Sequence, residues 1–350
     1  MRTHLFSSGY NSVLTILATI FVLWIGYYSL NWMILDASWT GSSREACLQE
    51  NRGACWPFVY HKFGQFIYGF YPEASRWRVN IIMFLGVLGL GWLMYPAMKH
   101  KKAVGIAMLT AYPILAFILL YGGFGFMKIE TRLWGGLLIT LVVASVGIVG
   151  SLPLGILLAL GRRSEMPVIR MFSIGFIEFW RGVPLITVLF MASAMLPLFL
   201  PEGASFDKLL RCLIVVMLFS SAYMAEVIRG GLQAIPQGQY EAARAIGMSY
   251  WSMHYHIILP QTLRLVIPGI VNTTIGLFKD TTLISIIGLF DLLGIVQANY
   301  ADSQWATPQT AMTGFLFAAL IFWVFCFGMS HYSRYVERKT GSKKILLRED

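Results

Sequence analysis

The sequence predicts an all-α polytopic membrane protein with about eight transmembrane helices. Of the 350 residues, 57% are hydrophobic and only 13% are charged, whereas a soluble domain carries about 25% charged residues. The apolar residues fall in runs of about 20, the length that a helix needs to cross the hydrocarbon core of a bilayer. The formal net charge is +10. Because the cations lie in short segments between apolar runs, this excess favours orientation in a bilayer over binding of nucleic acid.

Eight apolar runs are long enough to be spans. The expected ranges are 12–35, 79–98, 103–122, 133–160, 182–200, 208–228, 262–290 and 309–331. No small-x-small cleavage pattern follows the first run, so we expect a retained span rather than a removed signal peptide. The seventh run is too long for one straight span and contains Lys279 and Asp280, which predicts a bend there.

Basic residues in the loops predict the orientation. If the helices alternate, three groups of cations fall on one side: Lys99, Lys101 and Lys102; Arg162, Arg163 and Arg170; and Arg334, Arg338, Lys339, Lys343, Lys344 and Arg348. Cytoplasmic loops carry the excess of Lys and Arg in membrane proteins. We therefore expect both termini in the cytosol and the loop 36–78 outside. The basic residues of that long loop count less, because the rule applies best to short loops.

The outer loop contains two of the four cysteines, in the stretch CLQENRGAC from Cys47 to Cys55. Outside a bacterial inner membrane a disulfide can form, and NRG between the cysteines is typical of a turn. We favour a Cys47–Cys55 bridge, with two free thiols as the alternative. Cys212 and Cys326 fall inside expected spans, where packing is their expected role.

The chain divides into two blocks near the Gly-rich stretch YGGFGFMKIETR. Residues 1–130 carry three spans and the outer loop. Residues 131–335 carry five spans, are richer in proline and place charged residues inside the expected spans, and no internal repeat is found. Residues 336–350 form a basic cytoplasmic tail, which we expect to lie against anionic lipid.

A polar segment, QGQYEAARAIGMSYWSMHYHIILP, lies between the sixth and seventh spans. The sequence predicts a short helix over residues 239–246, after Pro236 and ending at Gly247. Ser249 predicts the cap of a second helix that stops at Pro260. An isolated helix this short is unstable in water. It must therefore pack on its own chain, as an ordinary ordered loop, or enter a groove on a partner protein.

The same segment resembles the EAA loop of ATP-binding-cassette importer permeases, in which E-A-A is followed by three residues, G, nine residues and I-x-L-P. The matching residues are Glu241, Ala242, Ala243, Gly247, Ile257, Leu259 and Pro260. The stretches FWRGVPL, AYMAEVIRGGL and FKDTTL, which begin at Phe179, Ala222 and Phe278, resemble the polar amino-acid branch of this family. The N-terminal block with its cysteine pair resembles the larger permease of general L-amino-acid transport systems.

The resemblance implies a five-helix importer permease core with three added N-terminal helices in the bacterial inner membrane. It implies that the coupling loop 232–260 is cytoplasmic and docks in a cleft of an ATPase subunit. The residues assigned to this coupling are Glu241, Ala242, Ala243, Arg244, Ile246, Gly247, Ile257, Leu259 and Pro260. The implied partners are cytoplasmic ATPase subunits, a periplasmic amino-acid-binding protein, and a second permease that is either a sibling (heterodimer) or a copy (homodimer).

The chain itself is expected to be no enzyme and to bind no cofactor or metal. The sequence contains no G-x-x-x-x-G-K-[ST] phosphate loop and no HExxH, so we expect ATP and magnesium to be used by partner subunits. The alternative function is an ion-gradient-driven secondary amino-acid transporter, which predicts broken helices and repeats in both halves. A membrane-embedded enzyme is a third possibility, with no nucleophile, metal site or acid–base cluster to support it.

Ionisable residues inside a membrane are costly and usually functional or paired. The candidates for a translocation path are Glu178, Arg181, Lys279 and Asp280. Glu178 and Arg181 lie three residues apart and are alternatively a simple structural pair, and Lys279 alternatively reaches the headgroups. Glu226 and Arg229 have the same spacing, where we expect a salt bridge that supports the coupling loop.

Overall fold

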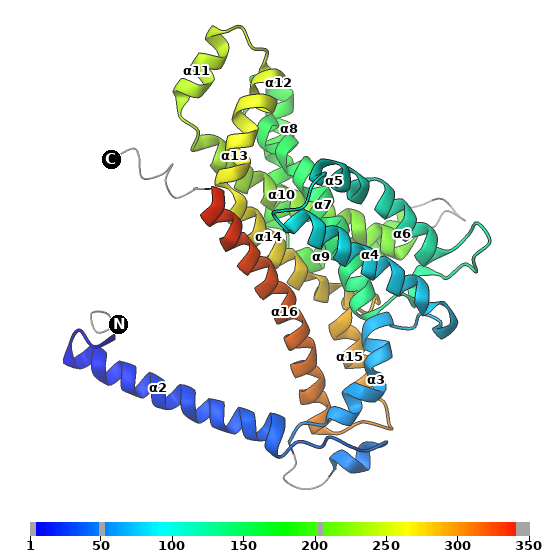
Figure 1. Ribbon diagram of the computed structural model, residues 1–350. Coiled ribbons are helices and arrows are strands. Elements are labelled where there is room, and N and C mark those ends of the chain that lie inside the picture. Colours follow the sequence, from blue (N-terminus) through cyan, green and yellow to red (C-terminus); the bar gives the residue numbers. More distant parts are fainter. Residues whose placement is uncertain (1–4, 49–52, 200, 202–205, 341–350) are drawn as a thin grey trace. The chain divides into compact units, whose positions relative to one another are not determined.

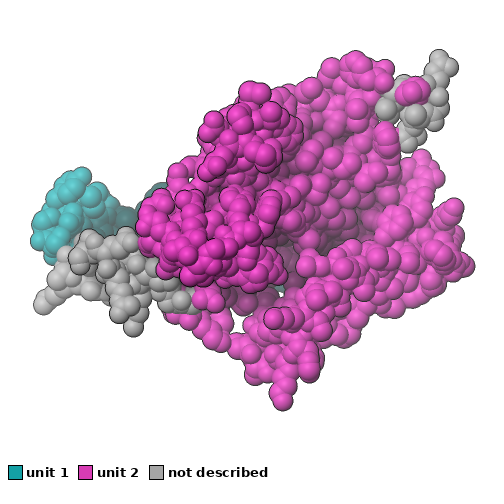
Figure 2. Space-filling model, turned by 90° about the horizontal axis from the view of Figure 1, so that it is seen from above, with its two compact units in different colours: residues 1–64, 296–320 teal, residues 65–295, 321–350 magenta. Residues whose placement is uncertain are grey.

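The computed structural model describes residues 5–48, 53–199, 201 and 206–340 (Figure 1). Helices are the regular elements of these ranges, so the all-α prediction is confirmed. Two compact units are distinguished in Figure 2: unit 1 comprises residues 1–64 and 296–320, and unit 2 comprises residues 65–295 and 321–350. They do not coincide with the sequence blocks, whose division near residue 130 stays a prediction.

Seven helices of the described chain are long and apolar enough to cross a membrane, or eight if one bent pair is counted as a span. The seven are Gly9–Leu35, Glu73–Met94, Lys101–Tyr121, Gly136–Arg162, Lys208–Gln233, Ile267–Ile287 and Pro308–Lys339. The predicted number of spans is therefore confirmed, whereas the fifth and seventh spans differ from the expectation in form.

The fifth expected span belongs to a bent pair of helices. The amphipathic helix α8 (Pro167–Gly182) and the segment Leu185–Phe199, which begins with α9 (Leu185–Phe190), meet at an angle of 100°. Pro184 causes the break, because a proline lacks an N–H donor and forces the preceding residue out of the helical region; Val183 is accordingly extended. The span expected over 182–200 corresponds to Leu185–Phe199, and its sharp junction with α8 was not predicted.

The seventh expected span is divided at Val266, well before Lys279 and Asp280, the residues for which a bend was predicted. Helix α13 (Leu259–Leu265) is separated from α14 (Ile267–Asp280) by Val266. Helix α14 then tightens into a 3-10 helix over Thr281–Ile287. Lys279 and Asp280 are the last two residues of α14, so both lie where the helix changes its winding.

Unit 1 contains α2 (Gly9–Leu30) and is crosslinked by a disulfide between Cys47 and Cys55, whose Cα atoms are 5.6 Å apart. Both cysteines are buried. The N–H of Cys55 donates to Thr313 Oγ1 at 2.8 Å, and Lys62 forms a 2.8 Å ion pair with Asp302. These contacts join segments that are more than 200 residues apart in the sequence. Of the expected NRG turn, Asn51 and Arg52 lie outside the described residues.

Reduction of the Cys47–Cys55 disulfide is expected to lower the free energy of unfolding of unit 1 by about 2.5 kcal/mol, because the bridge restricts the unfolded chain. The measurement uses a chain in which Cys212 and Cys326 are replaced by alanine. A maleimide should label neither remaining cysteine before reduction and both afterwards. Free labelling of both cysteines under oxidising conditions would contradict the bridge.

Unit 2 is built around two long helices, α7 (Gly136–Arg162) and α10 (Lys208–Gln233). Glycines let them approach closely: a Cβ atom at Gly155 would lie 3.1 Å from the backbone nitrogen of Ala225, and one at Gly147 would lie 3.0 Å from the side chain of Val216. The helices α4 (Arg76–Met94), α5 (Lys101–Leu109) and α6 (Ala111–Tyr121) pack on one another, and buried residues of α4 and α6 join those of α7 and α10 in one apolar cluster. The division into units assigns the residues of three helices partly to one unit and partly to the other: α3 (Trp56–Tyr68), α15 (Leu292–Tyr300) and α16 (Pro308–Thr340).

A fully buried carboxylate caps the start of α15. Asp291 accepts hydrogen bonds from the N–H groups of Gly294 at 2.8 Å and Leu293 at 3.2 Å. Burial raises the pKa of Asp291 to about 6, although these N–H groups act in the opposite direction. The native state therefore holds this proton more tightly than the unfolded chain does.

The stability of unit 2 is accordingly expected to rise as the pH falls from about 7 towards 4, since Asp291 takes up its proton on the native side first. The expected gain is about 3 kcal/mol. Asp291→Asn keeps a capping oxygen without the titration and should remove this part of the pH dependence. Melting temperatures of both proteins at several pH values check it. Identical pH profiles would contradict the assignment.

Candidate functional site

Helix α11 (Gln237–Ala245) stands apart from α10 and α13 at one end of unit 2 (Figure 1). Pro236 begins it in an extended conformation, so the short helix expected over 239–246 is confirmed to within two residues. Ser249 caps α12 (Tyr250–Met253) by accepting from the N–H of Ser252, as predicted. The expected stop at Pro260 is wrong. A π turn, His254–Ile258, carries the helix onward into α13, where proline in the first turn needs no donor.

Gly247 ends α11 in the left-handed conformation, with φ +75°. Its N–H donates to Arg244 O at 2.9 Å, and the N–H of Met248 donates to Ala243 O at 3.1 Å. This pair of bonds is the Schellman motif, which satisfies carbonyls at a helix end. A Cβ atom at Gly247 would meet nothing within 4 Å. The glycine is therefore required by the backbone conformation and not by crowding within this chain.

The two faces of α11 differ. Tyr240 and Ala243, three residues apart, are buried against the chain's own body. Glu241 and Ala242 are exposed, and 74% of Ile246 is accessible. An apolar side chain this exposed, beside small residues at the end of a helix, leaves a surface on which another protein can pack closely.

A cluster of buried apolar residues lies beneath α11. Its members are Ala159, Leu160, Ile177, Met224, Ala225, Ile228, Leu232, Ile235, Tyr240, Ala243, Met253 and Ile258. Ile257 and Leu259 of the EAA pattern pack against this cluster, whereas Pro260 is exposed. The pattern thus combines an exposed face with residues that hold the loop to α7 and α10.

Arg163 and Tyr240 fasten α11 by polar contacts. Arg163 Nη1 donates to Leu232 O at 3.1 Å and to Tyr240 Oη at 3.0 Å, and Tyr240 Oη donates to Leu232 O at 3.0 Å. Tyr240 also lies against His254, with ring centroids 6.2 Å apart. Burial lowers the pKa of His254, so this imidazole is neutral at neutral pH. Sequence reasoning used Arg163 only for orientation and missed Tyr240.

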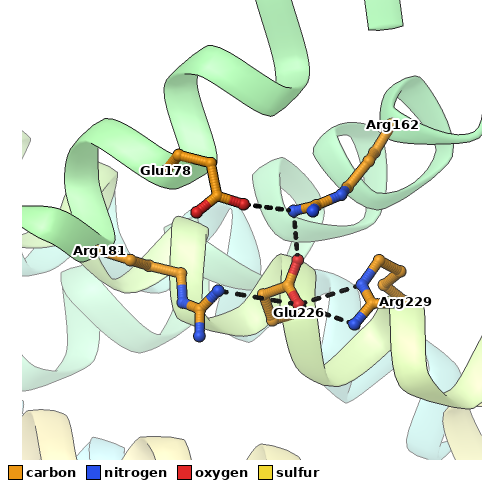
Figure 3. Close-up of polar contacts among 5 residues, drawn as sticks. All are labelled: Arg162, Glu178, Arg181, Glu226 and Arg229. Carbon is orange, nitrogen blue, oxygen red and sulfur yellow. Dashed lines mark hydrogen bonds and ion pairs between the residues drawn. The ribbon is translucent and has the colours of Figure 1, made fainter.

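Five charged side chains from α7, α8 and α10 converge nearby, and we call them the arginine–glutamate cluster (Figure 3). Glu226 lies at its centre. It accepts from Arg162 at 2.8 Å and from Arg229 at 3.0 Å, and it lies 3.8 Å from Arg181. Arg162 also donates to Glu178 at 3.1 Å. The cluster ties three helices together by charge-assisted hydrogen bonds.

The cluster settles the pairings that the sequence left open. The Glu226–Arg229 salt bridge is confirmed. The alternative in which Glu178 and Arg181 pair with each other is wrong. Glu178 forms its ion pair with Arg162, and Arg181 forms its ion pair with Glu226. Lys279 and Asp280, at the end of α14, are not members of this cluster, so the structure brings together two of the four candidate path residues.

Residues 151–342 match the family described as "Binding-protein-dependent transport system inner membrane component". The "Inner membrane amino-acid ABC transporter permease protein YhdY" of Escherichia coli (strain K12) is 53% identical over 97% of this chain and 92% of its own length. The "Glutamate/glutamine/aspartate/asparagine transport system permease protein BztC" of Rhodobacter capsulatus is 39% identical over the same shares.

A solved structure of an amino acid ABC transporter with histidines superposes with a TM-score of 0.50 and 28% sequence identity, covering 58% of this chain and 92% of that one. Together with the apolar helices described above, these relatives favour an importer permease over an ion-driven secondary transporter. The chain therefore belongs to the family of binding-protein-dependent transport system inner membrane components, as a multi-pass permease subunit of an ATP-binding-cassette importer in the bacterial inner membrane.

Proposed function

We propose that this permease imports L-amino acids and is driven by separate ATPase subunits that dock on α11. The observation that carries the docking is the two-sided geometry of α11: Tyr240 and Ala243 anchor it, while Glu241, Ala242 and Ile246 stay exposed. The names of the two relatives, one an amino-acid permease and one a permease for four acidic or amide amino acids, support the substrate class.

The loop 232–260 then faces the cytosol, as do both termini, and the loop 36–78 faces the periplasm. The ATPase subunits use ATP and magnesium, and this chain binds neither. Arg244 borders the docking face, where its charge helps to fix the orientation of the partner. Ile257, Leu259 and Pro260 transmit the contact into α13.

A periplasmic amino-acid-binding protein delivers the substrate to the outer side, and a second permease completes the path. We favour a sibling permease over a second copy, because the N-terminal block resembles the larger member of a two-permease system. For the path itself we propose Lys279 and the half-buried Asp280, which supply charges of both signs where α14 changes its winding. Glu178 and Arg181 border the path at the end that carries the arginine–glutamate cluster.

Reconstitution in proteoliposomes tests the proposal. The chain purified with its native partners should take up labelled L-amino acids when ATP is supplied on the α11 side, and uptake should need the binding protein on the other side. A panel of acidic, amide, basic and apolar amino acids identifies the substrate. The chain alone should neither transport nor hydrolyse ATP, and ion-driven uptake by the chain alone would contradict the proposal.

A further inference from the structure

Two consecutive arginines at the end of α7 reach into different contact networks. Arg162 is the last residue of α7 and Arg163 is its cap. Neighbouring residues of a helix point about 100° apart. Arg162 accordingly contacts Glu178 of α8 and Glu226 of α10, whereas Arg163 contacts Leu232 and Tyr240. One helix end thus holds both the arginine–glutamate cluster and α11.

The contacts of Arg163 form a closed triangle. The carbonyl of Leu232 accepts from both Arg163 and Tyr240, and Arg163 also donates to the Tyr240 hydroxyl, with all three distances between 3.0 and 3.1 Å. The guanidinium carbon lies 5.3 Å from the centre of the Tyr240 ring. Because each member has two partners, a rotation of α11 about its own axis must break at least two of these bonds.

We call the contacts of Arg162 and Arg163 at the end of α7 the joint. The helices α7, α8 and α10, which Arg162 connects, are closely packed. A Cβ atom at Gly161 would overlap the hydroxyl of Ser173 on α8, and one at Gly155 would lie 3.1 Å from the backbone of Ala225 on α10. Packed interiors of this kind transmit displacement instead of absorbing it. A force that reaches Arg162 and Arg163 therefore moves α7, α8 and α10 together.

We propose that Arg162 and Arg163 are positioning residues that transmit the movement of α11 to the bent pair α8–α9 and to α10. This proposal rests on the proposed docking of ATPase subunits at α11. Arg163 and Tyr240 fix α11 to the end of α7, and Arg162 passes the displacement to α8 and α10 through Glu178 and Glu226. Loss of these contacts retains ATP hydrolysis but uncouples it from transport.

The test compares Arg163→Met, which keeps most of the apolar stem and removes the donors, with Arg163→Lys and Tyr240→Phe. Each is measured in the full complex for uptake and for ATP hydrolysis. Arg163→Met is expected to lower the ratio of uptake to hydrolysis about tenfold, with ATP turnover within about twofold of the unmodified complex. Arg163→Lys should restore part of the ratio. The matched control Arg170→Met changes an exposed arginine of α8 and should leave the ratio unchanged.

Spin labels separate transmission from a merely structural role. Gln237→Cys on α11 and Met171→Cys on α8 are both exposed. In a chain without Cys212 and Cys326, the distance between the labels should stay constant when ATP binds. In the Arg163→Met variant, the distance between the labels should equal that of the unmodified protein without ATP, and it should shift or broaden when ATP binds. An unchanged uptake ratio or an unchanged distance in Arg163→Met would overturn the joint.

If Arg163→Met is not recovered from membranes, Tyr240→Phe tests the joint instead. It is expected to lower the ratio of uptake to ATP hydrolysis about threefold, and an unchanged ratio would overturn the joint. Crosslinking of Gln237→Cys to the ATPase subunit in the otherwise unmodified complex tests the docking itself. Absence of that crosslink counts against the proposed function, whereas a crosslink with an unchanged ratio counts against the joint alone.

Discussion

Gly247→Asp is expected to abolish ATP-dependent uptake while the membrane helices stay folded. The position has open space around it, so an added side chain meets no neighbour within the chain. The left-handed backbone costs an L-residue about 1 kcal/mol, which strains the end of α11 without unfolding unit 2. The larger effect arises at the docking face, where burying an unpaired carboxylate costs several kcal/mol. A cost of about 3 kcal/mol corresponds to a loss of more than 100-fold.

Uptake by proteoliposomes and co-purification of the ATPase subunits measure this effect. Gly247→Asn is the matched control, because asparagine has nearly the same shape and also tolerates the left-handed conformation. It should retain uptake within about threefold. Import at the normal rate by Gly247→Asp would contradict the docking of a partner at this end of α11.

Glu226→Gln is expected to have the second large effect, on stability and transport together. The carboxylate is 17% exposed and faces Arg162, Arg181 and Arg229. Its neutralisation leaves three guanidinium groups close together without their central anion. Breaking a fully buried pair costs about 3–5 kcal/mol. Because these arginines are 26–37% exposed, we expect about 2 kcal/mol, which lowers the melting temperature of the detergent-solubilised chain by about 5 °C.

Glu178→Gln is the control for this change, with the same chemistry in the same cluster. Glu178 has one ion pair, at 3.1 Å with Arg162, and is 55% exposed, so about 0.5 kcal/mol is expected. Transport should fall about tenfold in Glu226→Gln and only about threefold in Glu178→Gln, because the glutamine amide oxygen can still accept from Arg162. Equal effects of the two substitutions would show that Glu226 is not the centre of the cluster.

Local signals in the sequence predicted much of the fold and the position of the candidate site. The apolar runs located the spans, because lipid requires about 20 apolar residues for each crossing. Proline, glycine and serine marked the ends of the helices near α11, since each residue acts on its own backbone. Pro236, Gly247 and Ser249 accordingly lie where they were expected.

The remaining features depend on contacts between distant parts of the chain. The spacing of Glu178 and Arg181 suggests a pair on one helix. The observed partner of Glu178 is instead Arg162, which lies 16 residues earlier at the end of α7. Tyr240 shows its role only when Leu232 and Arg163 are folded against it. The bend at Pro184 was hidden because the apolar composition continues across it. Periodicity and composition carry no information about such partners.

The π turn His254–Ile258 lies in the segment that joins Gly247 to Pro260. A π turn holds one residue more than an α turn of the same kind. A π turn can lose this extra residue by returning to regular winding, but the loss of a residue from the regular turns beside it would rotate everything on the α11 side by about 100° relative to the following span. The outward face of Ala242 and Ile246 would then point elsewhere. The length of this linker therefore sets the angle between the exposed face of α11 and helix α13.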